Sequence, residues 1–227
     1  MNNLLRKILM IIIMISSISC GEPNNDLIKK NSKNVEKNTT INSKKILVVY
    51  FSQPETNNPN NMTKEEENST VVINGKVLGN TEYMAQIIKE NTGADIFRIE
   101  PEKPYTKNHT ELVALATEER KNNIRPDMLK KVENIQQYDT IFVGYPIWWG
   151  DMPMILYSFF DSEDLSGKEI IPFGTNGGSG FAGTVESIME LEPKATVSKN
   201  GLTISRDDIQ NSESEIVDWL KKLGYKK

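Results

Sequence analysis

The chain has almost none of the residues from which common catalytic sites are built. Its 227 residues include one cysteine, Cys20, and one histidine, His109. With one of each, the chain can form neither a zinc site of cysteine and histidine ligands nor an internal disulfide nor a dithiol redox centre. Because no histidine follows His109, a serine in the later loops also lacks the partner that an α/β-hydrolase triad requires. Redox chemistry in this protein would therefore need a bound cofactor.

Positive charge is not in excess either. Lysine and arginine together number 27, against 31 aspartates and glutamates, and the formal net charge is −4. Proteins that bind nucleic acid carry a basic face toward the phosphates, so this balance argues against a nucleic-acid partner. The phosphate-binding pattern G-x-x-x-x-G-K-[ST] is also missing, which argues against a nucleoside triphosphate as ligand.

The N-terminus lacks an apolar run long enough to span a membrane. The run Ile8–Ile15 follows Arg6 and Lys7, and this arrangement is typical of a signal peptide. Mostly small residues then lead to Cys20, and this stretch resembles the lipobox of bacterial lipoproteins. The resemblance implies a signal peptide over 1–19, cleavage before Cys20, and lipidation of Cys20. The alternative is an ordinary signal peptide with an incidental cysteine.

Residues 20–43 contain few apolar side chains among asparagine, lysine, threonine and serine. Such a segment cannot bury enough surface to offset its chain entropy, so it is predicted to be a flexible tether. The folded domain is then expected over residues 44–227. The whole arrangement predicts an exported protein, anchored by lipid to a bacterial membrane.

From Lys45 onward, apolar runs of strand length alternate with helical patterns. The predicted strands are 46–51, 95–100, 140–145, 170–173 and a short one within 195–205, and the predicted helices are 81–91, 109–121, 153–160, 181–191 and 207–223. This alternation predicts an α/β fold, a doubly wound five-stranded parallel sheet with helices on both faces. Ligands of such folds bind beyond the carboxyl ends of the strands, so the loops after strands one, three and four become candidates.

An insertion separates the first strand from the first helix. Within it, Asn74-Gly75 lies between the apolar stretches 71–73 and 77–78, which is a strong signal for a β-hairpin. The sequence leaves two interpretations open: the hairpin decorates an edge of the domain, or it shapes the ligand site.

The first candidate loop combines Ser52 with Gly79, Asn80 and Thr81 at the start of a predicted helix. Hydroxyls and the free N–H groups of a helix N-terminus can bind an anion without lysine or arginine. The alternative is that Asn80 only caps the helix.

The second candidate loop contains Pro146, Ile147, Trp148, Trp149 and Gly150. Two adjacent tryptophans in a loop at the ligand edge suggest a platform for a planar ring, the alternative being that both are buried in the core. If the loop is extended, adjacent side chains point to opposite sides. We therefore expect Trp149 to stack on the ring and Trp148 to pack at the rim.

The third candidate loop is rich in glycine and comprises Thr175, Asn176, Gly177, Gly178, Ser179, Gly180 and Phe181. Glycines allow the backbone to approach a ligand closely, the alternative being a merely flexible turn. Residues 178–183 also match the dinucleotide pattern G-x-G-x-x-G, but that pattern belongs to the first strand-to-helix turn of its fold, not the fourth.

Together the three loops resemble the FMN-binding loops of the flavodoxin-like family, over roughly residues 44–227. The resemblance implies that Ser52, Asn80 and Thr81 hold the FMN phosphate. It also implies that Trp149 and Phe181 flank the isoalloxazine ring while the backbone of Gly150 and Gly177 approaches it. The departure from the family is the insertion, which splits a phosphate-binding turn that is continuous in typical flavodoxins.

Three functions are compatible with these residues. The first is an FMN-dependent electron-transfer protein with a redox partner, tethered to a membrane surface through its lipid anchor. The second is a reductase of quinones or other small molecules that uses a nicotinamide donor, and the third is a lipoprotein binding module without a cofactor. No catalytic acid or base is required by the first, so His109 is expected to be a surface residue and Asp151 a solvated or helix-capping one.

Overall fold

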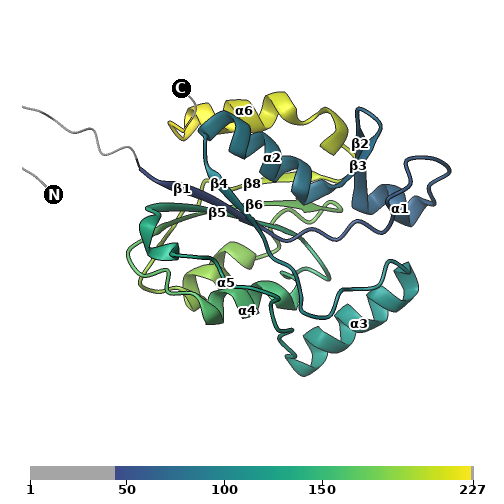
Figure 1. Cartoon of the computed structure of the whole chain (residues 1–227), viewed down its shortest axis with the longest axis horizontal. Coiled ribbons are helices and arrows are strands. Elements are labelled where there is room, and N and C mark those ends of the chain that lie inside the picture. The colour runs from purple at the N-terminus through teal and green to yellow at the C-terminus, as the bar shows by residue number, and fades with distance from the viewer. Residues whose placement is uncertain (1–43, 226–227) are drawn as a thin grey trace, which may run out of the picture. The chain divides into compact units, whose positions relative to one another are not determined.

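The computed structural model describes residues 44–225, which form a parallel sheet between two layers of helices (Figure 1). The strands are β1 (Ile46–Tyr50), β4 (Asp95–Arg98), β5 (Thr140–Pro146), β6 (Glu169–Asn176), β7 (Thr196–Val197) and β8 (Leu202–Ser205). Their order is β4-β1-β5-β6, with β7 and β8 both pairing with the far side of β6, and every pairing is parallel. The expected sheet of five parallel positions is confirmed, with two short strands sharing the fifth position.

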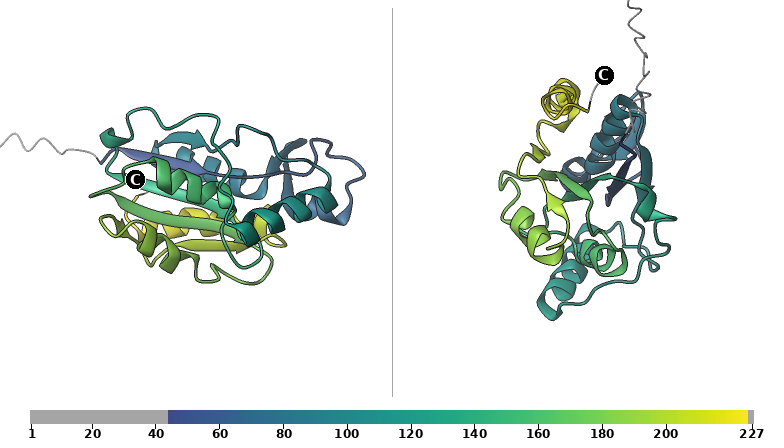
Figure 2. Two further views of the ribbon diagram at one scale, coloured as in Figure 1. Left: turned by 90° about the horizontal axis from the view of Figure 1, so that it is seen from below. Right: turned by 90° about the vertical axis from the view of Figure 1, so that its left-hand side faces the viewer.

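Both faces of the sheet are covered. Helices α2 (Asn80–Thr92) and α6 (Glu213–Lys222) pack on one face, and α3 (His109–Asn122), α4 (Met154–Ser162) and α5 (Thr184–Leu191) lie on the other (Figure 2). Alternate residues of β1 enter the two resulting cores: Val49 faces α4 and α5, whereas Val48 faces α2 and α6. This double burial is the physical reason for the uninterrupted apolar run of β1.

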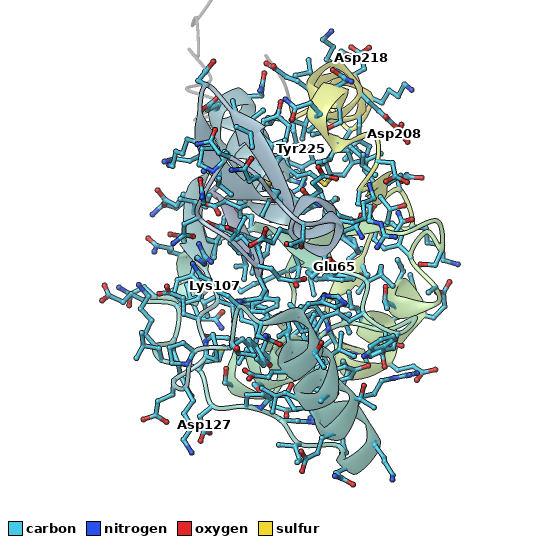
Figure 3. All side chains as sticks on the ribbon, turned by 90° about the vertical axis from the view of Figure 1, so that its right-hand side faces the viewer. Glu65, Lys107, Asp127, Asp208, Asp218 and Tyr225 are labelled. Atoms are coloured by element: carbon cyan, nitrogen blue, oxygen red, sulfur yellow. The ribbon has the colours of Figure 1, made fainter. Side chains whose placement is uncertain are left out.

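The outer surface is polar. Charged side chains such as Lys107, Asp127 and Asp208 are exposed on it (Figure 3). None of the helices between residues 44 and 225 has the length and apolarity needed to cross a membrane.

The insertion folds as a short helix followed by a hairpin. Helix α1 (Lys64–Ser69) begins with a capping box, in which the Thr63 hydroxyl and the Glu66 carboxylate each accept a backbone N–H of the other residue. Strands β2 (Thr70–Ile73) and β3 (Lys76–Gly79) form a separate antiparallel pair. Asn74 and Gly75 have φ angles of 52° and 77°, so the expected Asn-Gly hairpin turn is confirmed.

Three predicted boundaries were wrong. Strand β6 continues to Asn176, three residues beyond its predicted end at residue 173, so Thr175 and Asn176 lie in the strand and not in the loop after it. Helix α5 begins at Thr184 rather than Phe181, because Ala182 and Gly183 adopt positive φ angles of 51° and 87° that cannot continue a helix. The last predicted helix is also shorter, since a separate 3₁₀ turn (Ile209–Asn211) precedes α6.

Candidate functional site

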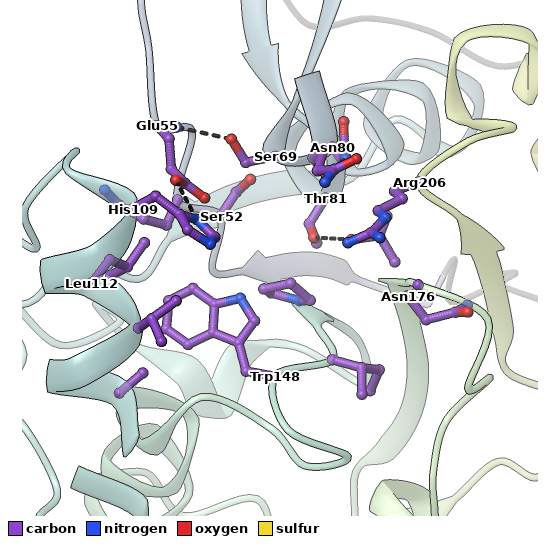
Figure 4. Close-up of a pocket in the computed structure, with 18 of the residues that line it drawn as sticks. Ser52, Glu55, Ser69, Asn80, Thr81, His109, Leu112, Trp148, Asn176 and Arg206 are labelled. Carbon is purple, nitrogen blue, oxygen red and sulfur yellow. Dashed lines mark hydrogen bonds and ion pairs between the residues drawn. The ribbon is translucent and has the colours of Figure 1, made fainter. Parts of the chain in front are cut away.

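The carboxyl ends of the strands open into one pocket of about 930 Å³, its open mouth included (Figure 4). The lining residues come from the ends of β5 and β6, from the loops after β1, β5, β6 and β8, from the N-terminus of α2, and from the insertion and α3. They are Ser52, Gln53, Glu55, Asn68, Ser69, Asn80, Thr81, His109, Leu112, Val113, Ala116, Pro146, Ile147, Trp148, Trp149, Thr175, Asn176, Gly177 and Arg206.

One end of the pocket presents buried hydroxyls beside a helix N-terminus. Ser52 is 3% exposed and Thr81 is 1% exposed, and Thr81 lies in the first turn of α2. Arg98 donates to the carbonyl oxygen of Ser52 (3.1 Å), and the Thr81 and Thr175 hydroxyls are 3.0 Å apart. Ser52 and Thr81 are therefore held in place by neighbouring elements, although the insertion separates these two residues in the sequence.

Gly79 makes this arrangement possible. A Cβ atom at this position would lie 2.1 Å from the Ser52 hydroxyl oxygen, so only glycine allows β3 to meet the end of β1 so closely. Gly79 itself does not line the pocket, but it fixes where Ser52 sits. Its φ of −70° is ordinary, so space rather than backbone strain requires the glycine.

Asn80 has a buried acceptor without a partner. Its side-chain amide nitrogen donates to the carbonyl of Asn68 (2.9 Å), but Oδ1 accepts no hydrogen bond within the described residues. The alternative role of Asn80 as helix cap is wrong, because the N-cap of α2 is Gly79. A buried acceptor of this kind is costly unless a ligand supplies a donor, and a sugar-alcohol hydroxyl would do so.

The aromatic loop is a tight turn rather than an extended segment. Trp148 and Asp151 exchange two backbone hydrogen bonds of 2.9 Å around Trp149 and Gly150, which have φ angles of 55° and 76°. A positive φ is a genuine outlier for a residue as bulky as tryptophan, and such outliers cluster at ligand sites. Gly150 lies at the turn and is not among the residues that line the pocket.

The two tryptophans have different environments. Trp148 is half-buried and packs edge-on against Phe51 and Tyr105, with ring centroids 5.6 Å and 6.0 Å away. Trp149 is 51% exposed, and both indoles line the pocket. Which of them stacks on a bound ring stays a prediction, since the turn replaces the extended geometry on which the choice of Trp149 was based.

We expect Trp149→Ala to weaken FMN binding by about tenfold to a hundredfold, because ring stacking contributes roughly 1–3 kcal/mol. The exposed indole of Trp149 is free to cover a ring, whereas Trp148 is committed to its aromatic neighbours. The measurement is an FMN titration of Trp148→Ala and Trp149→Ala side by side, each first shown to be folded. A larger loss of affinity in Trp148→Ala would reverse the assignment.

Only the first three residues of the predicted glycine-rich loop line the pocket. Thr175, Asn176 and Gly177 line it, and the Asn176 carboxamide oxygen orders the turn by accepting the N–H of Gly178 (2.7 Å). Residues 178–180 lie outside the lining.

Phe181 does not reach the pocket. Its ring instead packs 6.3 Å from Tyr145 and lies over Gly174 and Gly201, on the α5 side of the sheet. The positive φ angles around it turn the loop back toward the sheet. The geometry therefore gives no support to the expectation that Phe181 flanks a bound ring.

The insertion supplies part of the pocket wall through residues before the hairpin, whereas no residue of the hairpin itself (70–79) lines the pocket. The backbone N–H of Glu55 donates to Ser69 Oγ (3.0 Å), at the end of α1. Its side chain is 9% exposed and lies 2.8 Å from Nδ1 of His109. Burial raises the pKa of Glu55, and the neighbouring histidine opposes that rise.

Helix α3 supplies an adjoining wall, which sequence reasoning did not assign to the site. Leu112, Val113 and Ala116 form an apolar surface there, and His109 lies at the start of the same helix. His109 is half-exposed, as expected of a surface residue, but it also lines the pocket. Its position as the first residue of a helix at the ligand edge was the available signal.

Asp151 has a structural role. Its carboxylate accepts hydrogen bonds from its neighbour Met152 (2.7 Å) and from the Tyr157 hydroxyl (2.9 Å), and it faces Arg120 of α3 at 3.7 Å. These contacts tie the tryptophan turn to α3 and α4. The helix after it is capped by Pro153, so the expected capping by Asp151 was wrong.

Between residues 44 and 225, no group of histidine, cysteine, aspartate and glutamate side chains is placed to hold a metal ion. The pocket instead combines hydroxyls at a helix N-terminus, an unpaired amide oxygen, and indole rings. This set of groups fits a ligand with an anionic end, a hydroxylated middle and a planar ring.

Solved structures of flavoproteins share the fold of this chain. A candidate flavoprotein from Bacteroides eggerthii DSM 20697 is 27% identical, with 80% of this chain and 98% of that one covered and a TM-score of 0.57. One from Bacteroides uniformis ATCC 8492 is 26% identical, covering 78% and 98%, with a TM-score of 0.60. A flavoprotein from Lactobacillus acidophilus NCFM, crystallised in complex with FMN, shares the fold at 19% identity, covering 78% and 99%, with a TM-score of 0.54.

Comparison with curated proteins gives no match. The family comparison does: the flavodoxin family matches residues 70–223, which is more than half of the chain and includes the start of α2, the tryptophan turn and the glycine-rich loop. The chain therefore belongs to the flavodoxin family.

Proposed function

We propose that this protein binds FMN in the pocket at the carboxyl edge of the sheet and transfers electrons through it. The observation that carries the proposal is the pairing of buried hydroxyls at the α2 N-terminus with a tryptophan turn in one pocket. The flavodoxin family and the FMN complex of the Lactobacillus acidophilus flavoprotein support the choice of cofactor. When bound, FMN supplies one- and two-electron chemistry, and the protein sets its position and potential.

Each part of the pocket has a role in this proposal. Ser52, Thr81 and the N–H groups of α2 hold the phosphate, and the unpaired oxygen of Asn80 accepts from a ribityl hydroxyl. The tryptophan turn and the backbone at Gly177 enclose the ring. The chain needs no acid or base of its own for electron transfer.

The parts of the pocket outside the three predicted loops favour a second candidate function, a reductase of small molecules. Helix α3 adds an apolar wall, and the Glu55–His109 pair adds polar groups outside the three loops that were expected to bind FMN. An acceptor such as a quinone could pack against this apolar wall, beside the flavin ring. Oxidation of a nicotinamide donor with a quinone, measured on the FMN-loaded protein, would favour the reductase, and its absence would favour electron transfer to a partner protein.

We expect the chain from Gly21 to Lys227 to be purified as a yellow protein whose released flavin is FMN rather than FAD. The hydroxyl end of the pocket offers one anion site beside an aromatic turn, which suits one phosphate. The measurement is a visible spectrum followed by identification of the released flavin. Colourless protein that fails to bind added FMN would instead favour a binding module without a cofactor.

We also propose that the domain is exported and attached to a membrane by lipid on Cys20, with residues 20–43 as the tether. The signal peptide, Cys20 and the tether lie outside the described residues, so the support is the sequence pattern. Labelled fatty acid is expected to enter the wild-type protein and not Cys20→Ser. Equal labelling of both, or of neither, would contradict lipidation at this residue.

A further inference from the structure

Arg206 brings a positive charge to a pocket that was expected to bind an anion without one. It follows β8, whose carboxyl end lies at the same edge of the sheet as those of β1, β5 and β6. Its backbone N–H donates to the carbonyl of Asn176 (2.9 Å), which continues the pairing of β8 with β6. The residue is therefore fixed to the sheet at its backbone, while its side chain is exposed and lines the pocket.

The guanidinium lies at the hydroxyl end of the pocket. Its Cζ atom is 3.4 Å from the position that a Cβ atom would have on Gly177, so the group rests against that glycine. Two residues earlier, the Thr175 hydroxyl is 3.0 Å from that of Thr81. Figure 4 shows Arg206 on the same side of the pocket as Thr81 and Asn80, away from the Glu55–His109 pair.

The charge of Arg206 is not neutralised by the described part of the chain. Among residues 44–225, its guanidinium has neither an ion pair nor a side-chain hydrogen bond. The one carboxylate that lines the pocket, Glu55, is paired with His109. A phosphate at the α2 N-terminus would thus meet an unpaired cation.

We propose that Arg206 binds the phosphate of the cofactor, together with Ser52, Thr81 and the N-terminus of α2. The inference rests on the proposed binding of FMN. A phosphate monoester carries a charge between −1.5 and −2 at neutral pH, and the planar guanidinium can donate two parallel hydrogen bonds to its oxygens. Arg206 would then favour phosphorylated flavin over riboflavin.

The test is to titrate FMN and riboflavin into the full-length chain in detergent, as wild type, Arg206→Gln and Arg206→Lys. We expect Arg206→Gln to weaken FMN binding about tenfold and riboflavin binding less than twofold, with Arg206→Lys between the two for FMN. Added salt should weaken FMN binding less in Arg206→Gln than in the wild type, because the screened charge is gone. Arg125→Gln is the matched control, since Arg125 pairs with Asp161 and does not line the pocket.

The outcomes separate this inference from the proposed function. If the wild type binds FMN and Arg206→Gln binds it equally well, or loses FMN and riboflavin to the same extent, Arg206 does not bind the phosphate. An equal loss of FMN affinity in Arg125→Gln would assign the effect to overall charge and also overturn the inference. If the wild type binds no FMN, the proposed function and the inference fail together.

Discussion

Removing the hydroxyls of Ser52 and Thr81 together, as Ser52→Ala with Thr81→Val, is expected to weaken FMN binding by about a hundredfold or more. Both hydroxyls are buried beside the N-terminus of α2, where a phosphate could accept a hydrogen bond from each of them. A hydrogen bond to a charged group contributes roughly 1.5–3 kcal/mol, so the loss of two corresponds to about 10²–10⁴ in affinity. Riboflavin has no phosphate, and its affinity should change only a few-fold.

The measurement is a pair of titrations, with FMN and with riboflavin, on the double variant and on a control. Thr117→Val with Ser187→Ala removes the same two groups from α3 and α5, at positions that do not line the pocket. The control should bind both flavins as the wild type does. If the Ser52/Thr81 variant loses FMN and riboflavin equally, the hydroxyls do not hold the phosphate.

Gly144→Ala is expected to lower the free energy of unfolding by about 3 kcal/mol, the upper end of what overpacking a core costs. Gly144 lies in β5, between Tyr50 of β1 and Phe173 of β6. A Cβ atom there would be 2.1 Å from the Phe173 ring, which is completely buried. The sheet would have to shift beside the pocket loops.

Urea denaturation of Gly144→Ala, Phe173→Leu and the double variant would measure this effect. Phe173→Leu alone leaves a cavity, but in the double variant the smaller side chain makes room for the new methyl group. The double variant should therefore be less destabilised than the sum of the two single ones, which is the signature of direct contact. A Gly144→Ala protein within about 0.5 kcal/mol of the wild type would show that the core adapts to the methyl group.

The sequence predicted those features that depend on local patterns. The apolar run of β1, the Asn-Gly turn and the order of strands and helices all follow from residue spacing, and the structure has them. Phe181 was predicted to begin a helix, but the positive φ angles of Ala182 and Gly183 delay the start of α5 to Thr184 and leave Phe181 in the preceding turn. A non-glycine residue in this conformation leaves no reliable trace in the sequence.

The parts of the site that were missed depend on contacts between distant segments. Glu55 contacts His109 because the insertion and α3 both line the pocket. The two residues are 54 positions apart, and no periodicity in the sequence predicts that they lie together. Arg206 could have been found, since the fifth strand ends at the same edge as the others. The predicted ligand loops were those after strands one, three and four, so the loop after the fifth strand was not assigned to the site.

The split between Ser52 and Thr81 has a consequence for how this family member can change over time. A continuous turn holds its hydroxyls by its own backbone, so any added residue would displace them. Here β1 and α2 hold them, and the contact between Gly79 and Ser52 joins the two sides of the gap. Residues can therefore be added or exchanged between these two points at the modest entropic cost of a longer loop. The insertion is a place where side chains next to the pocket, such as Glu55, can be exchanged while the anion site stays the same.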